Sequence, residues 1–160
     1  IPKILLNIGK KKIKNIIINK IDKVSDKIIF IVKSEHKEKI KNYLNKVYKN
    51  KLNYELVIQK KPLGMAHAVY QSKKFIQKYQ KIMVIWGDHI GVAKSTILKV
   101  CAMKIKNNTL ILPVVKKKKL YIQFQFKKNK LVKIKERREG DECDNIGFSD
   151  VGTFVFQSKC

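Results

Sequence analysis

Cysteine is scarce in this 160-residue sequence, and its three copies, Cys101, Cys143 and Cys160, form no CxxC pair. An odd number of widely spaced cysteines argues against a disulfide framework or a structural zinc site, so we expect reduced thiols and a cytoplasmic protein. No apolar run is long enough to cross a membrane, and no signal peptide is visible, so we expect no membrane partner.

Several catalytic motifs are missing as well. The sequence contains no HExxH, no GxSxG, no Walker phosphate loop and no Cys/His cluster with the spacing of metal ligands. These absences exclude the protease, hydrolase and P-loop classes. An initiator methionine is also lacking, and the chain ends on VFQSKC inside a strand-like segment. We therefore expect residues 1–160 to be a single domain truncated at both ends.

Arginine is almost absent from a chain that is otherwise strongly basic. Lysine and arginine total 37 against 12 acidic residues, a net charge of +25, yet Arg137 and Arg138 are the only arginines. Proteins that read nucleic acids usually rely on arginine forks. Lysines spread over every part of the chain favour a solvated surface instead, although the charge still attracts polyanions such as nucleoside triphosphates.

Hydrophobic residues, 44% of the chain, alternate between helical and strand spacing. The alternation predicts an α/β sandwich with a mostly parallel sheet. Later strand-like segments follow without helices between them, so mixed or antiparallel strands are added there, with a hairpin around 128–129 and a loop at the lysine run 116–119. The predicted helices are 12–24, 36–50, 64–79 and 95–105, the last capped by Ser95, and the predicted strands are 27–33, 53–59, 81–86, 109–115, 120–126, 131–137 and 151–156.

Ligands of open parallel sheets bind beyond the carboxyl ends of the strands, and the stretch from Gln59 to Met65 has that position. Gln59 can donate to and accept from a nucleobase edge. Gly64 lacks the Cβ that would block a flat ring, and the backbone N–H groups of the helix start can bind an anion. Taken alone, an ordinary strand-to-helix turn explains the stretch equally simply.

Two other stretches have comparable positions. Asp88 follows Gly87 just beyond a predicted strand, where a carboxylate can bind a metal ion; on its own it reads first as a turn or N-cap aspartate. Residues 135–152 hold half of the acidic residues beside Arg137 and Arg138. Such a loop can bind a polyhydroxylated or phosphorylated substrate, or it can be a flexible surface loop. The histidines at 36, 67 and 89 read as structural.

Together these stretches resemble the nucleotidyltransferases that activate sugar phosphates, above all the uridyltransferase domain that makes UDP-N-acetylglucosamine. The resemblance spans nearly the whole chain, and its landmarks keep the family's order. It is carried by IPK at 1–3, IQKKPLGMAHAV at 58–69, IWGD at 85–88, IKERREGD at 134–141 and SDVGTFVF at 149–156.

The resemblance implies a three-layer, Rossmann-like (glycosyltransferase-A-like) α/β fold with a mixed, mostly parallel central sheet. It also implies a Mg²⁺ cofactor on Asp88. Several positions depart from the family pattern: Met65 and Ala66 stand where the family has Thr and Gly, Ile122 stands where it has Gly, and Asp150 stands where it has Asn. The implied site residues are Lys3 and Asp88 for catalysis, Lys3, Gln59, Leu63, Gly64, Met65 and Gly87 for the nucleotide, and Glu136, Asp150 and Gly152 for the second substrate.

The function implied is transfer of a nucleoside monophosphate from a nucleoside triphosphate, UTP being favoured, to a sugar 1-phosphate such as N-acetylglucosamine 1-phosphate, with release of pyrophosphate. A CTP-dependent enzyme acting on another phosphorylated metabolite is an alternative. A second alternative is a non-catalytic basic domain in which Tyr121, Phe124 and Phe126 stack RNA bases, and a third is an inactive remnant of the enzyme. The oligomeric state is left open.

Overall fold

The computed structural model describes residues 2–49, 51–106 and 108–158. The predicted helix end at residue 50 and the third cysteine, Cys160, therefore lie outside the described residues. The first part of the chain forms η1 (a 3₁₀ helix, Lys3–Leu5), β1 (Asn7–Ile8), β2 (Lys11–Lys12), α1 (Ile13–Ile21), β3 (Ile28–Val32), η2 (Ser34–His36), α2 (Lys37–Tyr48), β4 (Tyr54–Ile58), α3 (Gly64–Gln71), α4 (Lys73–Ile76), β5 (Lys81–Ile85) and α5 (Lys94–Ala102).

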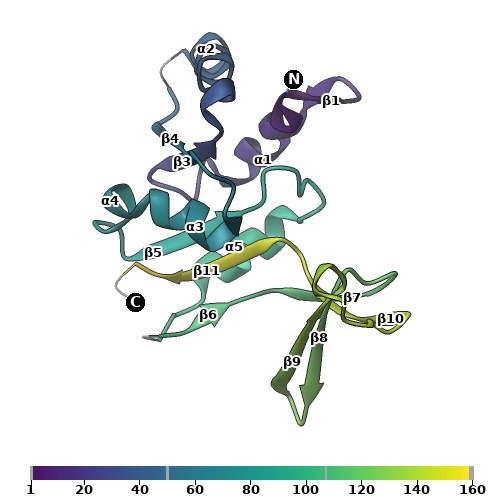
Figure 1. Cartoon of the computed structure of the whole chain (residues 1–160). Helices are drawn as coiled ribbons and strands as arrows, with labels where there is room; N and C mark the ends of the chain where they lie inside the picture. The colour runs from purple at the N-terminus through teal and green to yellow at the C-terminus, as the bar shows by residue number, and fades with distance from the viewer. Residues whose placement is uncertain (1, 50, 107, 159–160) are drawn as a thin grey trace.

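Strands dominate the remainder of the chain. Figure 1 shows the hairpin made by the third and fourth of these later strands projecting away from the helical part of the molecule. The elements are β6 (Leu110–Ile111), β7 (Val114–Lys118), β8 (Ile122–Lys127), β9 (Lys130–Glu136), η3 (Arg137–Glu139), β10 (Ile146–Asp150) and β11 (Thr153–Gln157).

The main core lies where α1, α2 and α5 meet the first strands. Isoleucines at helical spacing give α1 an apolar face, as the sequence predicts, and the corresponding face of α2 is fully buried at Ile40 and Leu44. Val92, in the loop after β5, is buried in the same core. This packing anchors the loop to the helices. The buried cluster consists of Ile13, Ile17, Ile18, Ile21, Ile28, Ile40, Leu44, Val92 and Ile97.

The helices and strands form an α/β fold, as predicted. A larger share of the strand pairs is antiparallel than the sequence suggests. Among the strands that the structure describes, β3 and β4 pair in parallel, whereas β11 runs antiparallel between β5 and β6. The physical reason is that no helix intervenes between the strands that follow α5. Without a helical crossover of the kind that joins the parallel strands β3 and β4, these strands can pair antiparallel, even with partners that are not consecutive in the chain.

The second sheet is antiparallel, with the strand order β7-β10-β8-β9. The predicted hairpin is present: Lys128 and Asn129 join β8 to β9 with φ values of 48° and 61°, as a tight hairpin turn requires. The prediction of a loop at 116–119 is wrong, because 116–118 pair with β10. Lysines suit this position because β7 is an edge strand, where charged side chains discourage further pairing. β10 itself was not anticipated.

Two helix predictions need correction. The continuous helix expected over 64–79 is broken at Ser72, whose hydroxyl donates to the Val69 carbonyl at 2.6 Å and so competes with helix hydrogen bonds. No residue of α3 is fully buried. The helix α5 begins at Lys94 after Ala93, so Ser95 lies inside its first turn and is not the N-cap.

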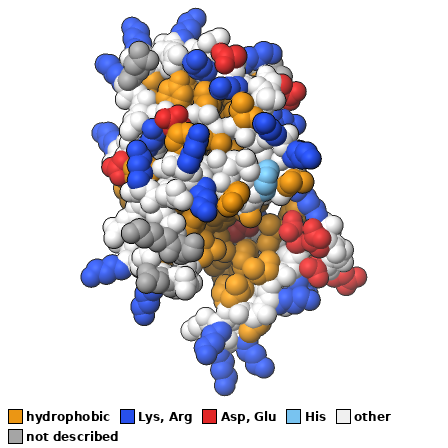
Figure 2. All heavy atoms as spheres, turned by 60° about the vertical axis from the view of Figure 1, so that its left-hand side comes forward, with side chains coloured by type: hydrophobic (Ala, Val, Ile, Leu, Met, Phe, Trp, Pro, Cys, Tyr) orange, Lys and Arg blue, Asp and Glu red, His pale blue; other side chains and the backbone are white. Residues whose placement is uncertain are grey.

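The surface carries lysine over all of its parts. Figure 2 shows lysine and arginine side chains scattered across the visible face rather than gathered into one patch. This distribution is the one expected of a solvated basic surface. None of the helices in the described ranges is sufficiently long and apolar to cross a membrane.

Candidate active site

The predicted stretches meet at the carboxyl end of β5, and Trp86 joins two of them. Its indole N–H donates to the sulfur of Met65 at 2.9 Å, which connects the β5 end to the start of α3. Its backbone N–H donates to the carbonyl of Gly152 at 3.0 Å, which connects the same point to the turn between β10 and β11. Segments 64–65, 86–88 and 150–152 therefore form one neighbourhood.

The segment that contains Lys3 adjoins this neighbourhood. A Cβ on Gly87 would lie 3.6 Å from Cδ1 of Ile4, so η1 packs beside the residue that precedes Asp88. Lys3 itself is exposed, in the first position of η1. The structure thus brings an exposed ammonium-bearing residue to the same end of β5 as Asp88.

Asp88 lies in the turn after β5 with its side chain exposed. Backbone bonds hold the turn: His89 N–H donates to Trp86 O at 3.1 Å, and Ile90 N–H donates to Asp88 O at 3.0 Å. Since α5 begins at Lys94 without a side-chain cap, the carboxylate is not an N-cap. It makes no hydrogen bond to any other residue that the structure describes, so both oxygens are available to a ligand.

A divalent ion fits this carboxylate in one particular way. Within the described ranges no three His, Cys, Asp or Glu side chains gather into a metal cage. Mg²⁺ is commonly held by one or two carboxylates, with water and substrate phosphates completing its octahedron. The chemistry of the site therefore suits an ion shared between Asp88 and a phosphorylated substrate.

The side chain of Gln59 bonds to residues of the turn and helix that follow it in the sequence. Its amide nitrogen donates to the Gly64 carbonyl at 3.1 Å and lies 3.1 Å from Nδ1 of His67. Gln71 contacts the other ring nitrogen of His67 at 3.0 Å. A neutral imidazole accepts at one nitrogen only; because the Gln59 nitrogen also donates to Gly64, Gln71 is the glutamine that must present its oxygen to the ring. His67 is structural, as predicted, and the Gln59 amide organises the turn.

Gly64 has a backbone reason for being glycine. Its φ is +86°, a conformation that side chains disfavour, and a Cβ built there would meet nothing within 4 Å. Leu63 and Met65 beside it are 66% and 43% exposed. These three exposed residues, called the shelf below, are where the sequence predicts that a flat ring lies, although the turn alone is sufficient to require glycine.

Gly152 and His89 are packed against each other. Gly152 is buried with φ +68°, and a Cβ there would lie 1.9 Å from Nδ1 of His89. That nitrogen lies 3.1 Å from the Val151 carbonyl, which can only accept, so the proton is on Nδ1. The His89 ring also packs on Trp86, with centroids 4.6 Å apart. His89 is therefore structural, as predicted. Its contacts with Val151 and Trp86 hold in place the position directly after Asp88.

The predicted residues of the second substrate are only partly brought together. Asp150 belongs to the neighbourhood, with Oδ1 accepting the Gly152 N–H at 2.6 Å. Glu136 ends β9 and pairs with Ile122. β10 runs antiparallel to β8, so its last residue, Asp150, lies near the start of β8, where Ile122 pairs with Glu136. Asp150 and Glu136 therefore lie at the same end of the second sheet. No hydrogen bond or ion pair joins Glu136 to the 86–88 turn in the described part of the chain.

The arginines of the acidic segment serve the local structure. Arg137 donates through Nε to the Leu120 carbonyl at 2.6 Å, and Arg138 donates to the hydroxyl of Tyr121. Residues 137–139 form η3 and 146–150 form β10, so the segment is not one flexible loop. Arg137 and Arg138 were predicted to bind the substrate. The structure gives them contacts within the protein, with Leu120 and Tyr121.

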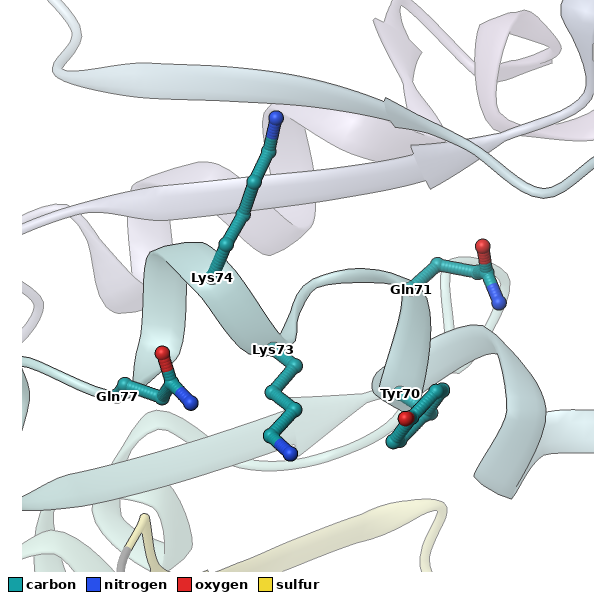
Figure 3. Close-up of a pocket in the computed structure, with 5 residues that line it drawn as sticks. All are labelled: Tyr70, Gln71, Lys73, Lys74 and Gln77. Atoms are coloured by element: carbon teal, nitrogen blue, oxygen red, sulfur yellow. The ribbon is translucent and has the colours of Figure 1, made fainter.

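Two depressions of the surface lie away from the predicted site residues. One, of about 370 Å³, lies at α3 and α4, where Figure 3 shows Tyr70 and Lys73 directed to the same side while Lys74 points away. The other, of about 290 Å³, lies at the opposite end of β3, beside Ile28 and Asn53. The candidate site itself lies at a strand end where Gly87 and Asp88 are exposed.

Sequence reasoning missed Trp86, which is the residue that joins the neighbourhood. It is the only tryptophan of the chain, and it stands directly before Gly87 and Asp88. A large aromatic with a single donor at the end of a half-buried strand is a signal that it has a specific partner nearby.

The family model described as nucleotidyl transferase matches residues 1–160. The chain belongs to this family. The resemblance stated from the sequence is therefore confirmed at the level of the family. "Bifunctional protein GlmU" of Buchnera aphidicola subsp. Acyrthosiphon pisum is 30% identical over 160 residues, which is 99% of this chain and 34% of the relative. The chain thus spans about a third of the length of the curated relatives that it matches over its full extent.

Solved structures confirm the Rossmann-like fold class. A putative glucose-1-phosphate thymidylyltransferase from Bacillus anthracis superposes with a TM-score of 0.73 at 18% identity, over 98% of this chain and 63% of the other. An inositol-1-phosphate CTP transferase from T. maritima gives 0.72 at 19% identity, over 99% and 63%. At these identities the likeness is one of fold.

Proposed function

We propose that the protein transfers a nucleoside monophosphate from a nucleoside triphosphate to the phosphate of a sugar 1-phosphate and releases pyrophosphate. The observation that supports this most is the Trp86–Met65 hydrogen bond of 2.9 Å, because it joins the turn of an exposed carboxylate to the shelf. A flat base needs such a shelf, and the triphosphate attached to it needs a cation-binding carboxylate nearby.

The base would lie on the shelf formed by Leu63, Gly64 and Met65. Gln59 stands at its edge with its amide nitrogen already used, while none of the described hydrogen bonds involves its carbonyl oxygen. That oxygen can accept from N3–H of uracil or from the exocyclic amine of cytosine. UTP is favoured by the resemblance of the LGMAHAV stretch to the uridyltransferase domain.

Catalysis would rest on charge and alignment. An oxygen of the acceptor phosphate attacks the α-phosphorus, the bond from this phosphorus to the bridging oxygen breaks, and pyrophosphate leaves with the electron pair. Mg²⁺, when bound, neutralises charge on the phosphates. Asp88 would hold that ion, and the ammonium of Lys3 would offset the repulsion between the two anions. Alignment of the substrates contributes about 7–11 kcal/mol to lowering such barriers.

No side chain has to act as a base, because the phosphate monoester that attacks is already ionised. This is consistent with Asp88 and Asp150, the carboxylates of the neighbourhood, having no histidine as a hydrogen-bonded partner in the described structure. The Oδ2 oxygen of Asp150 can accept a sugar hydroxyl while Oδ1 holds the turn at Gly152. Glu136, at the same end of the second sheet, would contact the acceptor from the other side.

A CTP-dependent transfer to a different phosphorylated metabolite is the second candidate. The free carbonyl oxygen of Gln59 suits cytosine as well as uracil, and Met65 and Ala66 differ from the family's usual residues. The RNA-binding alternative has less support. Phe124 is buried, Phe126 packs edge-on against Phe148, and the Tyr121 ring faces Arg138.

A pyrophosphate-release assay tests the proposal. The full chain is incubated with Mg²⁺ and either UTP or CTP against a panel of sugar 1-phosphates and other phosphorylated acceptors. Release that requires both a nucleotide and an acceptor supports the proposal, and the pair that reacts identifies the substrates. Strong, steeply salt-dependent RNA binding without any pyrophosphate release would favour the non-catalytic alternative.

A further inference from the structure

Lys20 reaches from the last turn of α1 to the loop that follows Asp88. Its Nζ donates to the carbonyls of Ile90 at 2.5 Å and Val92 at 2.7 Å. The side chain is half-buried, and its partners are 70 and 72 residues away in the sequence. No other lysine among the described residues bonds to this loop.

The bonded loop is directly connected to the carboxylate. The Ile90 N–H donates to the carbonyl of Asp88 at 3.0 Å, so one peptide group separates the Lys20 bond from Asp88 itself. The side chains of Ile90 and Val92 pack into the main core. Core packing thus anchors the side chains of the loop. The backbone carbonyls of Ile90 and Val92 are both bonded by one ammonium group, that of Lys20.

We infer that Lys20 is a positioning residue that holds the Asp88 turn in the geometry needed to bind a divalent cation. The inference rests on the proposed function, in which Asp88 holds the ion. A carboxylate that shares an ion with a substrate must be placed within about 0.5 Å of its productive position. Two charge-assisted hydrogen bonds that fix the peptides after Asp88 supply that placement before any ligand arrives.

A purely structural anchor would behave differently. If Lys20 only attached α1 to the loop, its loss would lower thermal stability and leave ion affinity unchanged below the melting temperature. A positioning residue changes ion affinity in protein that is still folded. The core contacts of Ile90 and Val92 are expected to keep a Lys20 variant folded.

The single tryptophan provides a readout that is independent of turnover. Trp86 lies two residues before Asp88, so paramagnetic Mn²⁺ bound at Asp88 should quench its fluorescence. MnCl₂ is titrated into the full chain with UTP or CTP present. We compare the wild type, Lys20→Met, which keeps the length but removes the donors, Lys20→Arg, which keeps donors, and Lys23→Met, an exposed control nearby.

We expect Lys20→Met to raise the half-saturating Mn²⁺ concentration about tenfold, the loss typical of removing charge-assisted hydrogen bonds. Lys20→Arg should recover most of the affinity, and Lys23→Met should match the wild type. Circular dichroism and a melting curve confirm that each variant is folded. Equal Mn²⁺ affinity in wild type and folded Lys20→Met would overturn the inference.

Asp88→Asn separates this inference from the proposed function. If Asp88→Asn weakens quenching and Lys20→Met does not, the Lys20 inference alone fails. If Asp88→Asn has no effect, or the wild type shows no quenching, the metal assignment in the proposed function fails and the inference falls with it.

Discussion

The indole nitrogen of Trp86 lies 2.9 Å from the sulfur of Met65. These residues are 21 positions apart in the sequence and come from the end of β5 and the start of α3. The contact joins the shelf at 63–65 to the turn that carries Asp88. In the proposed function, the geometry of nucleotide binding depends on this N–H···S bond, whose two partners can be changed independently.

Trp86→Phe keeps an aromatic ring and removes the donor, whereas Met65→Leu keeps the volume and removes the acceptor. Each change should raise KM for the nucleotide by about two- to fivefold, which corresponds to one modest hydrogen bond. Steady-state kinetics at fixed acceptor concentration measure the effect. The double variant should be no worse than the poorer single variant, and additive losses would show that the two residues act separately.

Gly152→Ala should destabilise the protein by on the order of 2–3 kcal/mol. The new methyl group would sit 1.9 Å from Nδ1 of His89, at a φ of +68° that alanine disfavours. Gly140→Ala is a matched control, since its φ is +87° but a Cβ there meets nothing within 4 Å. Urea denaturation should show a smaller loss of about 1–2 kcal/mol for the control. Equal losses would mean that His89 moves away freely.

Lys14 is a buried cation in α1 that should destabilise the fold. It has no exposed surface, its Nζ has no hydrogen-bond partner among the described residues, and it lies 2.8 Å from the Tyr43 ring centroid. Burial, with a smaller effect of the charge on Lys12, lowers the pKa of Lys14 from 10.5 to about 7. Lys14→Met should raise the unfolding free energy by about 1–3 kcal/mol near pH 6. Lys41→Met, on the exposed face of α2, should change it little.

The same lysine predicts the direction of a pH dependence. Because the pKa of Lys14 is lower in the folded chain than in the unfolded one, unfolding between pH 7 and 10.5 takes up a proton. This group's contribution to stability therefore increases as the pH rises through that window and is constant below it. Comparing urea midpoints of wild type and Lys14→Met at several pH values isolates the contribution. A pH-independent difference between them would contradict the shifted pKa.

The sequence predicted the parts of the fold that depend on local pattern. The isoleucine spacing of α1, the short β-branched strands β3, β4 and β5, and the turn at Lys128 and Asn129 are all found, since periodicity and turn conformation are local properties. The family landmarks also indicated which strand ends meet, because the carboxyl ends of neighbouring strands lie at one edge.

Features decided by distant partners escaped the sequence. The lysines of β7 form a strand only because β10 pairs with them, and β10 lies 30 or so residues later in the chain. The break at Ser72 depends on a hydroxyl that bonds backward to Val69. Likewise, the Trp86–Met65 and Lys20–Ile90 hydrogen bonds join residues that are distant in the sequence, so no periodic pattern of residues predicts them.

The role of Asp88 is the central claim, and pyrophosphate release by Asp88→Asn tests it most directly. Asp88 is exposed and its carboxylate has no bonded partner among the described residues, so the variant should fold and melt like the wild type. Asp26→Asn, an exposed aspartate far from the β5 end in sequence, serves as the control. We predict that Asp88→Asn lowers the turnover of the reactive nucleotide–acceptor pair by about 100-fold or more while Asp26→Asn leaves it unchanged. Turnover by Asp88→Asn equal to that of the wild type would contradict the account.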